Sequence, residues 1–205
     1  MSKQSITPTL QPVFGYSDLL TLTDYVADAW TRGVDRDWSA QAGTLEWSCS
    51  TTADHAFDAT LAIGFFLASR RQESYPTWGE LFSVGPNATP EQLIEAIQVA
   101  GRLVAGVVAT TPDDVTAIIH RNPSKTAPPQ DFAPRAALEL ILHGHDVAAG
   151  LQVDFEPPGD ACARLRDHTR DWRHWQGGVW APLQFTDDPW GDIVGGSGRA
   201  RFDSV

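Results

Sequence analysis

Apolar residues recur at the spacing of an α-helix in four long segments of this chain, and this pattern limits the fold more than any other feature. The clearest segment is capped by Thr89, with Pro90 in its first turn and Gln92 closing a capping box. Thr111 and Pro112 end it. Its apolar positions form one stripe, made of Leu93, Ile97, Ala100, Val104 and Val107. A stripe of this kind has to be buried against other helices.

The other segments complete a bundle. We predict three further long helices, from about Ser17 to Trp30, from Ser48 or Ser50 to about Arg71, and from Pro134 to Gly150. A weaker helix runs from about Asp160 to Trp175, and residues 114–120 form a short strand or an extended arm. The sequence thus predicts an all-α, up-and-down four-helix bundle with a longer crossover and an irregular C-terminal tail. The length fits one domain over residues 1–205, with the tail from about residue 177 packed on it.

The charge and the cysteine content exclude several classes of protein. The chain has 26 acidic and 15 basic residues, and its net charge of −11 repels the phosphate backbone of a nucleic acid. No apolar run reaches the roughly 18 residues of a membrane span, and the first residues lack the apolar core of a signal peptide. Cys49 and Cys162 are too few for a disulfide framework. We therefore expect a cytoplasmic protein that binds neither nucleic acid nor a membrane.

Two segments that lie far apart in the sequence contain residues typical of a metal site. Glu139 and His143 are four positions apart, so on a helix their side chains share one face and can bind one ion. His55, on a second helix, would supply a third ligand and leave coordination positions open, which is typical of a catalytic metal. Two imidazoles and a carboxylate suit zinc, our first choice, but also nickel, iron or manganese. The alternatives are a surface ion pair for Glu139 and His143, and a histidine bonded to a carbonyl for His55.

Several neighbouring residues have two interpretations. His145 could join His143 on one metal if the segment were a strand, but on a helix two residues apart lie on roughly opposite faces, so we exclude it. Asp146 and Asp58 each lie one turn from a predicted ligand, and each either supports that ligand or makes a structural bond. Cys49 lies near a helix N-terminus, where a thiol pKa can fall, but a small buried residue is the more usual role.

The residues around the predicted metal suggest where a substrate would bind. Ala59 and Ala62 follow His55 at helical spacing, and their small side chains would leave space for an ion and a substrate. Arg135 could bind a substrate carboxylate through both of its guanidinium nitrogens, and so could Arg199, although a salt bridge would explain either residue equally well. The sequence does not identify a residue that carries out the chemical step.

Three motifs in order resemble a known family. They are a tryptophan eight positions before a helical histidine (Trp47 and His55), the pattern Glu-x3-His-Gly-x-Asp (residues 139–146), and a short C-terminal segment that leads into Gly198-Arg199. Together they resemble the DinB-like superfamily, and within it the mycothiol-dependent maleylpyruvate isomerase family. The resemblance implies a four-helix bundle with a divalent metal held by His55, Glu139 and His143. It further implies that a short helix within residues 188–199 leads into the Gly-Arg pair. It also implies a low-molecular-weight thiol, mycothiol, as cosubstrate.

The resemblance implies an enzyme that joins a thiol to a small electrophile. The family's isomerase carries an additional C-terminal domain, for which this chain, ending at Val205, has no room. We therefore predict a metal-dependent thiol S-transferase. The alternatives are a metal-dependent hydrolase or isomerase of the same fold, or a bundle without catalytic activity that acts as a ligand-binding or stress-response protein. The electrophile and the oligomeric state stay open, with a homodimer as one option.

Overall fold

The structure is a computed structural model that describes residues 13–76, 82–121, 124–175 and 180–200. Its long helices are α1 (Tyr16–Arg32), α2 (Cys49–Ser69), α3 (Pro90–Thr110) and α4 (Phe132–Leu151). The shorter elements are strands β1 (Ala117–Arg121) and β2 (Ser124–Ala127) and helices α5 (Gly159–Thr169) and α6 (Pro189–Gly196), with 3-10 turns at Pro129–Asp131 and Arg173–Trp175.

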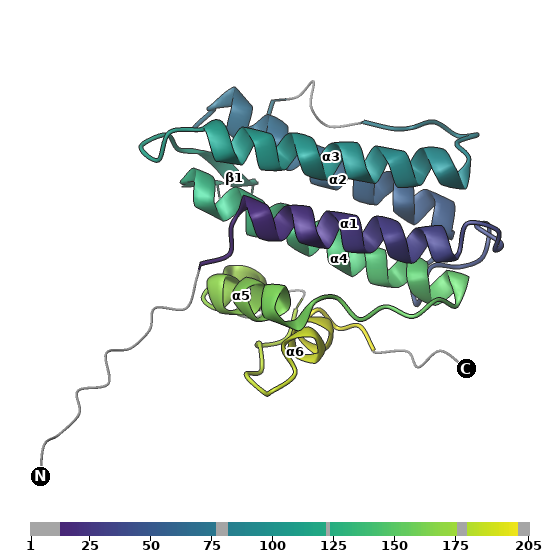
Figure 1. Cartoon of the computed structure of the whole chain (residues 1–205). Helices are drawn as coiled ribbons and strands as arrows, with labels where there is room; N and C mark the ends of the chain where they lie inside the picture. Colours follow the sequence, from purple (N-terminus) through teal and green to yellow (C-terminus); the bar gives the residue numbers. More distant parts are fainter. Residues whose placement is uncertain (1–12, 77–81, 122–123, 176–179, 201–205) are drawn as a thin grey trace, which may run out of the picture.

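The four long helices pack as a square bundle. Helices α1 and α2 lie on opposite corners, and each packs against both α3 and α4. Figure 1 shows α2 and α3 in one layer, α1 and α4 in the next, and α5 and α6 covering the outer side of that second layer. The predicted all-α bundle fold is confirmed.

Helix boundaries follow the capping residues of the sequence. Ser48 caps α2, because its side chain accepts a hydrogen bond from Thr51 N at 3.1 Å. At α3 the Thr89 side chain accepts from Gln92 N, and the Gln92 side chain accepts from Thr89 N at 2.9 Å, which is the predicted capping box.

Helix α3 is long and apolar enough, by length and composition alone, to cross a membrane. One such helix is weak support for a membrane span, because a helix in the core of a bundle can have the same composition. In this structure Leu93, Ile97 and Val104 are buried against the neighbouring helices. Packing within the bundle therefore explains the apolar stripe of α3.

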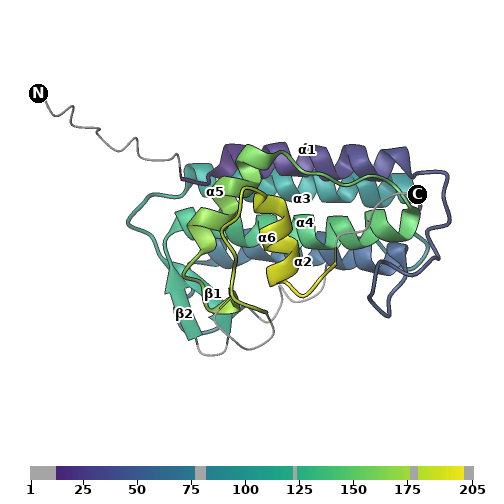
Figure 2. The same ribbon diagram turned by 90° about the horizontal axis from the view of Figure 1, so that it is seen from below.

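The connection between α3 and α4 contains a strand in the segment predicted as a short strand or an extended arm, and a second strand that was not predicted. The extended arm at residues 114–120 contains β1, and the Pro-, Ser- and Thr-rich loop after it contains β2, which pairs with β1 in antiparallel fashion. This hairpin is attached to the end of α2, because Ile118 N donates to Arg71 O at 2.7 Å and the Tyr75 hydroxyl donates to Ile119 O at 2.9 Å. Figure 2 shows the hairpin at one end of the bundle.

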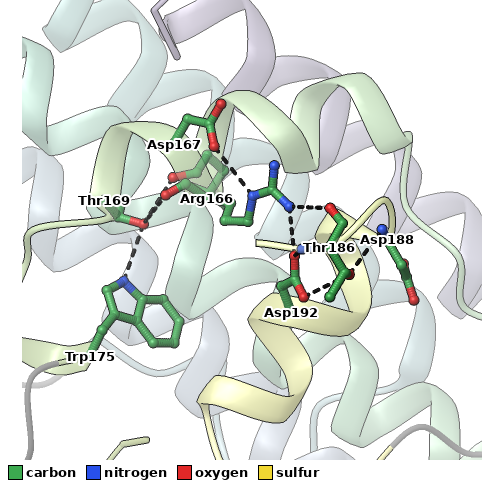
Figure 3. Close-up of polar contacts among 8 residues, drawn as sticks. Arg166, Asp167, Thr169, Trp175, Thr186, Asp188 and Asp192 are labelled. Carbon is green, nitrogen blue, oxygen red and sulfur yellow. Dashed lines mark hydrogen bonds and ion pairs between the residues drawn. The ribbon is translucent and has the colours of Figure 1, made fainter. Parts of the chain in front are cut away.

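The C-terminal tail contains one helix, α6, at the place where the resemblance implies a short helix before Gly198-Arg199 (residues 177–179, where the predicted tail begins, lie outside the described part). A buried ion pair holds α6 against α5: Arg166 Nη1 lies 2.6 Å from Asp192 Oδ2, and it also donates to Thr186 O at 2.8 Å. Asp192 also accepts from the backbone and the hydroxyl of Thr186 (Figure 3). This network fixes the start of α6 next to α5.

Candidate metal centre

The structure brings His55, Glu139 and His143 together in the core of the bundle. Their ligand atoms all lie within 4.8 Å of one another, and no other group of His, Cys, Asp and Glu in the described part of the chain meets that condition. Glu139 and His143 are one turn apart on α4, and His55 projects from the second turn of α2, which packs along α4. The three side chains are all partly exposed, so an ion could reach them from solvent.

The electrostatic surroundings favour the forms of these groups that bind metals. Burial lowers the pKa of His55, and the nearby His143 lowers it further. Burial raises the pKa of the Glu139 carboxyl, but Arg135, His143 and His55 outweigh it, so that pKa lies below its ordinary value. A neutral imidazole and an ionised carboxylate are therefore favoured at neutral pH, and these are the forms that donate an electron pair to a metal.

Arg135 lies one turn before Glu139 on α4 and pairs with it. Its Nη1 is 2.5 Å from Glu139 Oε1, whereas Glu139 Oε2 faces His143 Nε2 at 3.6 Å. The guanidinium thus orients the carboxylate, with one oxygen toward itself and the other toward the histidine. Arg135 Nε is buried and has no hydrogen-bond partner among the described residues, which leaves a donor available beside the site.

Asp146 connects His143 to the C-terminal tail. Its Oδ2 lies 3.3 Å from His143 Nδ1, and both of its oxygens accept hydrogen bonds from Arg199, at 2.8 to 3.1 Å. Burial raises the pKa of the Asp146 carboxyl, but the contacts with His143 and Arg199 outweigh it, so that pKa is lowered. Arg199, predicted as a candidate for substrate binding, therefore makes a salt bridge with this buried carboxylate.

His145 points away from the three residues, as expected for a helix. Its Nε2 lies 3.0 Å from Ala200 O, and its ring packs edge-on against Phe155 and Trp190. The Gly144 between the two histidines lets α4 approach α1 closely, because a Cβ there would lie 3.0 Å from a methyl group of Val26. The His-Gly-His sequence therefore places one histidine at the candidate metal site and the other beneath the tail.

Trp47 borders the candidate site, which the sequence did not suggest. Its ring lies edge-on to that of His55, with centroids 5.1 Å apart, and its side chain is 46% exposed. On α2, Ala62 is buried in the core, whereas Ala59 is half-buried. The structure thus distinguishes the two alanines that the sequence suggested as the lining of a substrate cavity.

Two other candidates from the sequence have structural roles. The Cys49 thiol is buried and lies 3.7 Å from Val147 O, and burial raises its pKa to about 11, so it is a poor nucleophile at neutral pH. Asp58 accepts a hydrogen bond from Phe82 N at 2.7 Å and so holds the segment that precedes α3.

Comparison with known proteins supports the fold. No family model and no curated protein sequence matches this chain. The solved structure of a mycothiol-dependent maleylpyruvate isomerase is similar over 92% of both chains, with 15% sequence identity and a TM-score of 0.57. The structure of a histidine-to-alanine mutant of such an isomerase is similar over 82% of this chain and 75% of its own, with 14% identity and a TM-score of 0.51. These likenesses establish a shared fold.

Proposed function

We propose that this protein is a metal-dependent enzyme that transfers a low-molecular-weight thiol, mycothiol, to a small electrophile. The observation that carries the proposal is the convergence of His55, Glu139 and His143 on one point in the bundle. The donor set fits a divalent metal, zinc first, because it consists of two imidazole nitrogens and one carboxylate oxygen. A metal bound by three protein ligands keeps positions open, and it lowers the pKa of a thiol that binds there.

The surrounding residues would shape the reaction. Arg135 orients Glu139, and its buried Nε has no hydrogen-bond partner among the described residues, so it is our candidate for binding an anionic group of the thiol or of the electrophile. Trp47 forms a partly exposed aromatic wall beside His55. Ala59 would leave space on the neighbouring face of α2. These residues would bind and orient the reactants, and we assign none of them a proton transfer.

The similarity to mycothiol-dependent isomerases supports mycothiol as the thiol. The expectation that this chain is too short for an isomerase is weakened, because one isomerase structure is matched over 92% of its own length. Isomerisation is therefore the second candidate. In that reaction the thiol adds to the substrate and leaves again, whereas in a transfer it remains bonded to the product.

The first experiment measures metal content and thiol chemistry on the same preparation. The purified protein is analysed for zinc, nickel, iron and manganese, and then incubated with mycothiol and a panel of small electrophiles, with and without a chelator. Disappearance of the thiol with formation of a conjugate, abolished by the chelator and restored by metal, is the expected result. Recovery of the thiol with a rearranged substrate would instead indicate isomerisation.

A matched variant makes the test specific. In His143→Ala both bound metal and thiol conjugation should be lost, because the variant lacks one of the three ligands. A His143→Ala protein that conjugates thiol at the wild-type rate without bound metal would contradict the mechanism. If the metal-loaded wild type conjugates no electrophile but hydrolyses an ester or amide in the panel, we would infer that water, and not a thiol, is the nucleophile.

A further inference from the structure

We propose that Asp146 is a positioning residue for His143 and that Arg199 fixes it in place, so that the C-terminal segment contributes to metal affinity. This inference rests on the metal site proposed above. It assigns a function to a tail whose other described contacts only hold it against the rest of the protein. It also gives a role to a buried carboxylate that faces a histidine and an arginine at once.

The two nitrogens of His143 face different partners. Its Nε2 lies toward Glu139, 3.6 Å from Oε2, and its Nδ1 lies 3.3 Å from Asp146 Oδ2. That Nδ1 is buried, and no described residue makes an aligned hydrogen bond with it. A neutral imidazole carries its proton on one nitrogen only, and a carboxylate beside Nδ1 favours that position. The lone pair of Nε2 then points to the side where Glu139 lies, which is the arrangement that a metal ligand needs.

Asp146 is held too firmly to serve another partner. Arg199 Nε lies 2.9 and 3.1 Å from its two oxygens, and Arg199 Nη2 lies 2.8 Å from Oδ2. The Asp146 side chain is only 3% exposed. Such a paired, bidentate contact fixes the plane of the carboxylate as well as its position. Rotation of Asp146 away from His143 would break this pair.

The tail reaches this point through a defined backbone path. Arg199 N donates to Val194 O at 3.1 Å at the end of α6, and the next residue, Ala200, has its carbonyl 3.0 Å from His145 Nε2. Two consecutive residues of the tail, Arg199 and Ala200, therefore contact two consecutive residues of α4. Arg199 is thus fixed by contacts at the C-terminal end of α6, whereas Asp192 lies in the first turn of that helix.

The competing explanation is that Asp146 and Arg199 only fasten the tail. The Arg166–Asp192 pair between α5 and α6 is a matched control, because it is also a buried ion pair and the Asp192 side chain is likewise 3% exposed (Figure 3). The hydrogen bonds described for this pair include none of the three candidate ligands. Loss of the Arg166–Asp192 pair should loosen the contact between α5 and α6 without changing the tautomer of His143.

The experiment compares Asp146→Asn, Arg199→Ala and Asp192→Asn in the full chain. Zn²⁺ affinity is measured by competition with a chromophoric chelator, the Co²⁺ absorption spectrum reports ligand geometry, and melting of the metal-free protein reports stability. Asp146→Asn removes the negative charge that favours a proton on His143 Nδ1. Because Arg199 donates to both carboxylate oxygens, the new NH₂ group faces an Arg199 donor at either position, so the side chain can no longer be held as the carboxylate is. We expect Zn²⁺ affinity to fall by roughly 10–100-fold, with an altered Co²⁺ spectrum.

The two remaining variants separate positioning from anchoring. Arg199→Ala should weaken Zn²⁺ binding in the same direction but by less, and combining it with Asp146→Asn should add little, because Arg199 acts through Asp146. Asp192→Asn should lower the melting temperature and leave Zn²⁺ affinity and the Co²⁺ spectrum unchanged.

Any other outcome of these measurements overturns either the positioning role of Asp146 or the metal site itself. Unchanged Zn²⁺ affinity in Asp146→Asn, with a lower melting temperature, would show an anchor only and overturn this inference alone. If Asp146→Asn does not fold, Arg199→Ala decides in the same way. A loss of Zn²⁺ affinity in Asp192→Asn equal to that in Asp146→Asn would also overturn the positioning role of Asp146. A wild-type protein that binds no Zn²⁺ or Co²⁺ would instead overturn the metal site itself.

Discussion

The imidazole rings of His55 and His143 lie edge to face, with centroids 4.9 Å apart and planes at 81°, although they belong to different helices. Burial lowers the pKa of His55, and the neighbouring His143 lowers it further. A divalent cation would bind both nitrogen lone pairs without adding a proton to either ring. This arrangement of the two histidines is the one that the metal site proposed above requires.

The first prediction compares two histidines that are two residues apart on α4. His143→Ala should abolish metal binding and change the stability of the metal-free protein little. His145→Ala should retain the metal but lose about 1–3 kcal/mol of stability, because it removes a buried ring that contacts Trp190 and is paired with the Ala200 carbonyl. Metal analysis of both variants as purified, and denaturant unfolding of their metal-free forms, check this. Loss of metal in His145→Ala with retention in His143→Ala would reverse the assignment.

The second prediction concerns the contact between α1 and α3. A Cβ at Gly101 would lie 2.1 Å from the buried Thr23 Oγ1, so Gly101→Ala should force the helices apart and destabilise the protein by roughly 1–3 kcal/mol. Gly106, on the same helix, has open space around its Cα, so Gly106→Ala should stabilise by about 0.4–1 kcal/mol. Urea unfolding measures both. Similar effects of the two substitutions would mean that the helices do not approach closely at Gly101.

The helical bundle could be predicted because its signals are local. Ser48 and Thr89 accept hydrogen bonds from backbone N–H groups within three residues, and an apolar stripe is a property of one segment. The hairpin was missed, and α6 was expected from the resemblance alone, for the opposite reason. β2 is stabilised by pairing with β1, and α6 by the contact of Asp192 with Arg166, which comes from another helix. Neither partner can be identified from the local sequence.

The candidate site was only partly predictable for a similar reason. The four-residue spacing of Glu139 and His143 is visible in the sequence, and helical geometry placed His145 on another face. That His55 would lie beside them came from a resemblance, because spacing along one helix does not show which helix packs against it. The contact of Arg199 with Asp146 spans 53 positions and had no sequence signal beyond the two residue types.

The third prediction concerns pH. Burial lowers the pKa of His120 to about 4, and the nearby cations of Arg135, Lys125 and Arg173 act in the same direction, opposed by Asp131. An unfolded histidine has a pKa of about 6.5, so between about pH 4 and 6.5 the unfolded chain binds a proton that the folded protein does not. The free energy of unfolding should therefore fall as the pH is lowered through this window.

The effect can be isolated with His120→Gln. A shift of this size corresponds to about 3 kcal/mol for a fully buried group, but His120 is only half-buried, so we expect roughly 1–2 kcal/mol. Urea unfolding between pH 4 and 7 should show a shallower pH dependence in the variant than in the wild type. Parallel curves for the two proteins would mean that His120 titrates normally.

The fourth prediction concerns the cavity beside the metal. Ala59 and Ala62 follow His55 along α2, but only Ala62 is buried in the core, at 8% exposure. Ala62→Phe should therefore overpack the bundle and cost about 1–3 kcal/mol. Ala59→Phe should fold normally, keep its metal and weaken thiol binding, because the new ring would fill the space beside His55. Thiol affinity, metal content and melting temperature are measured on both variants. An Ala59→Phe protein that binds metal and thiol like the wild type would place the thiol on another face of the site.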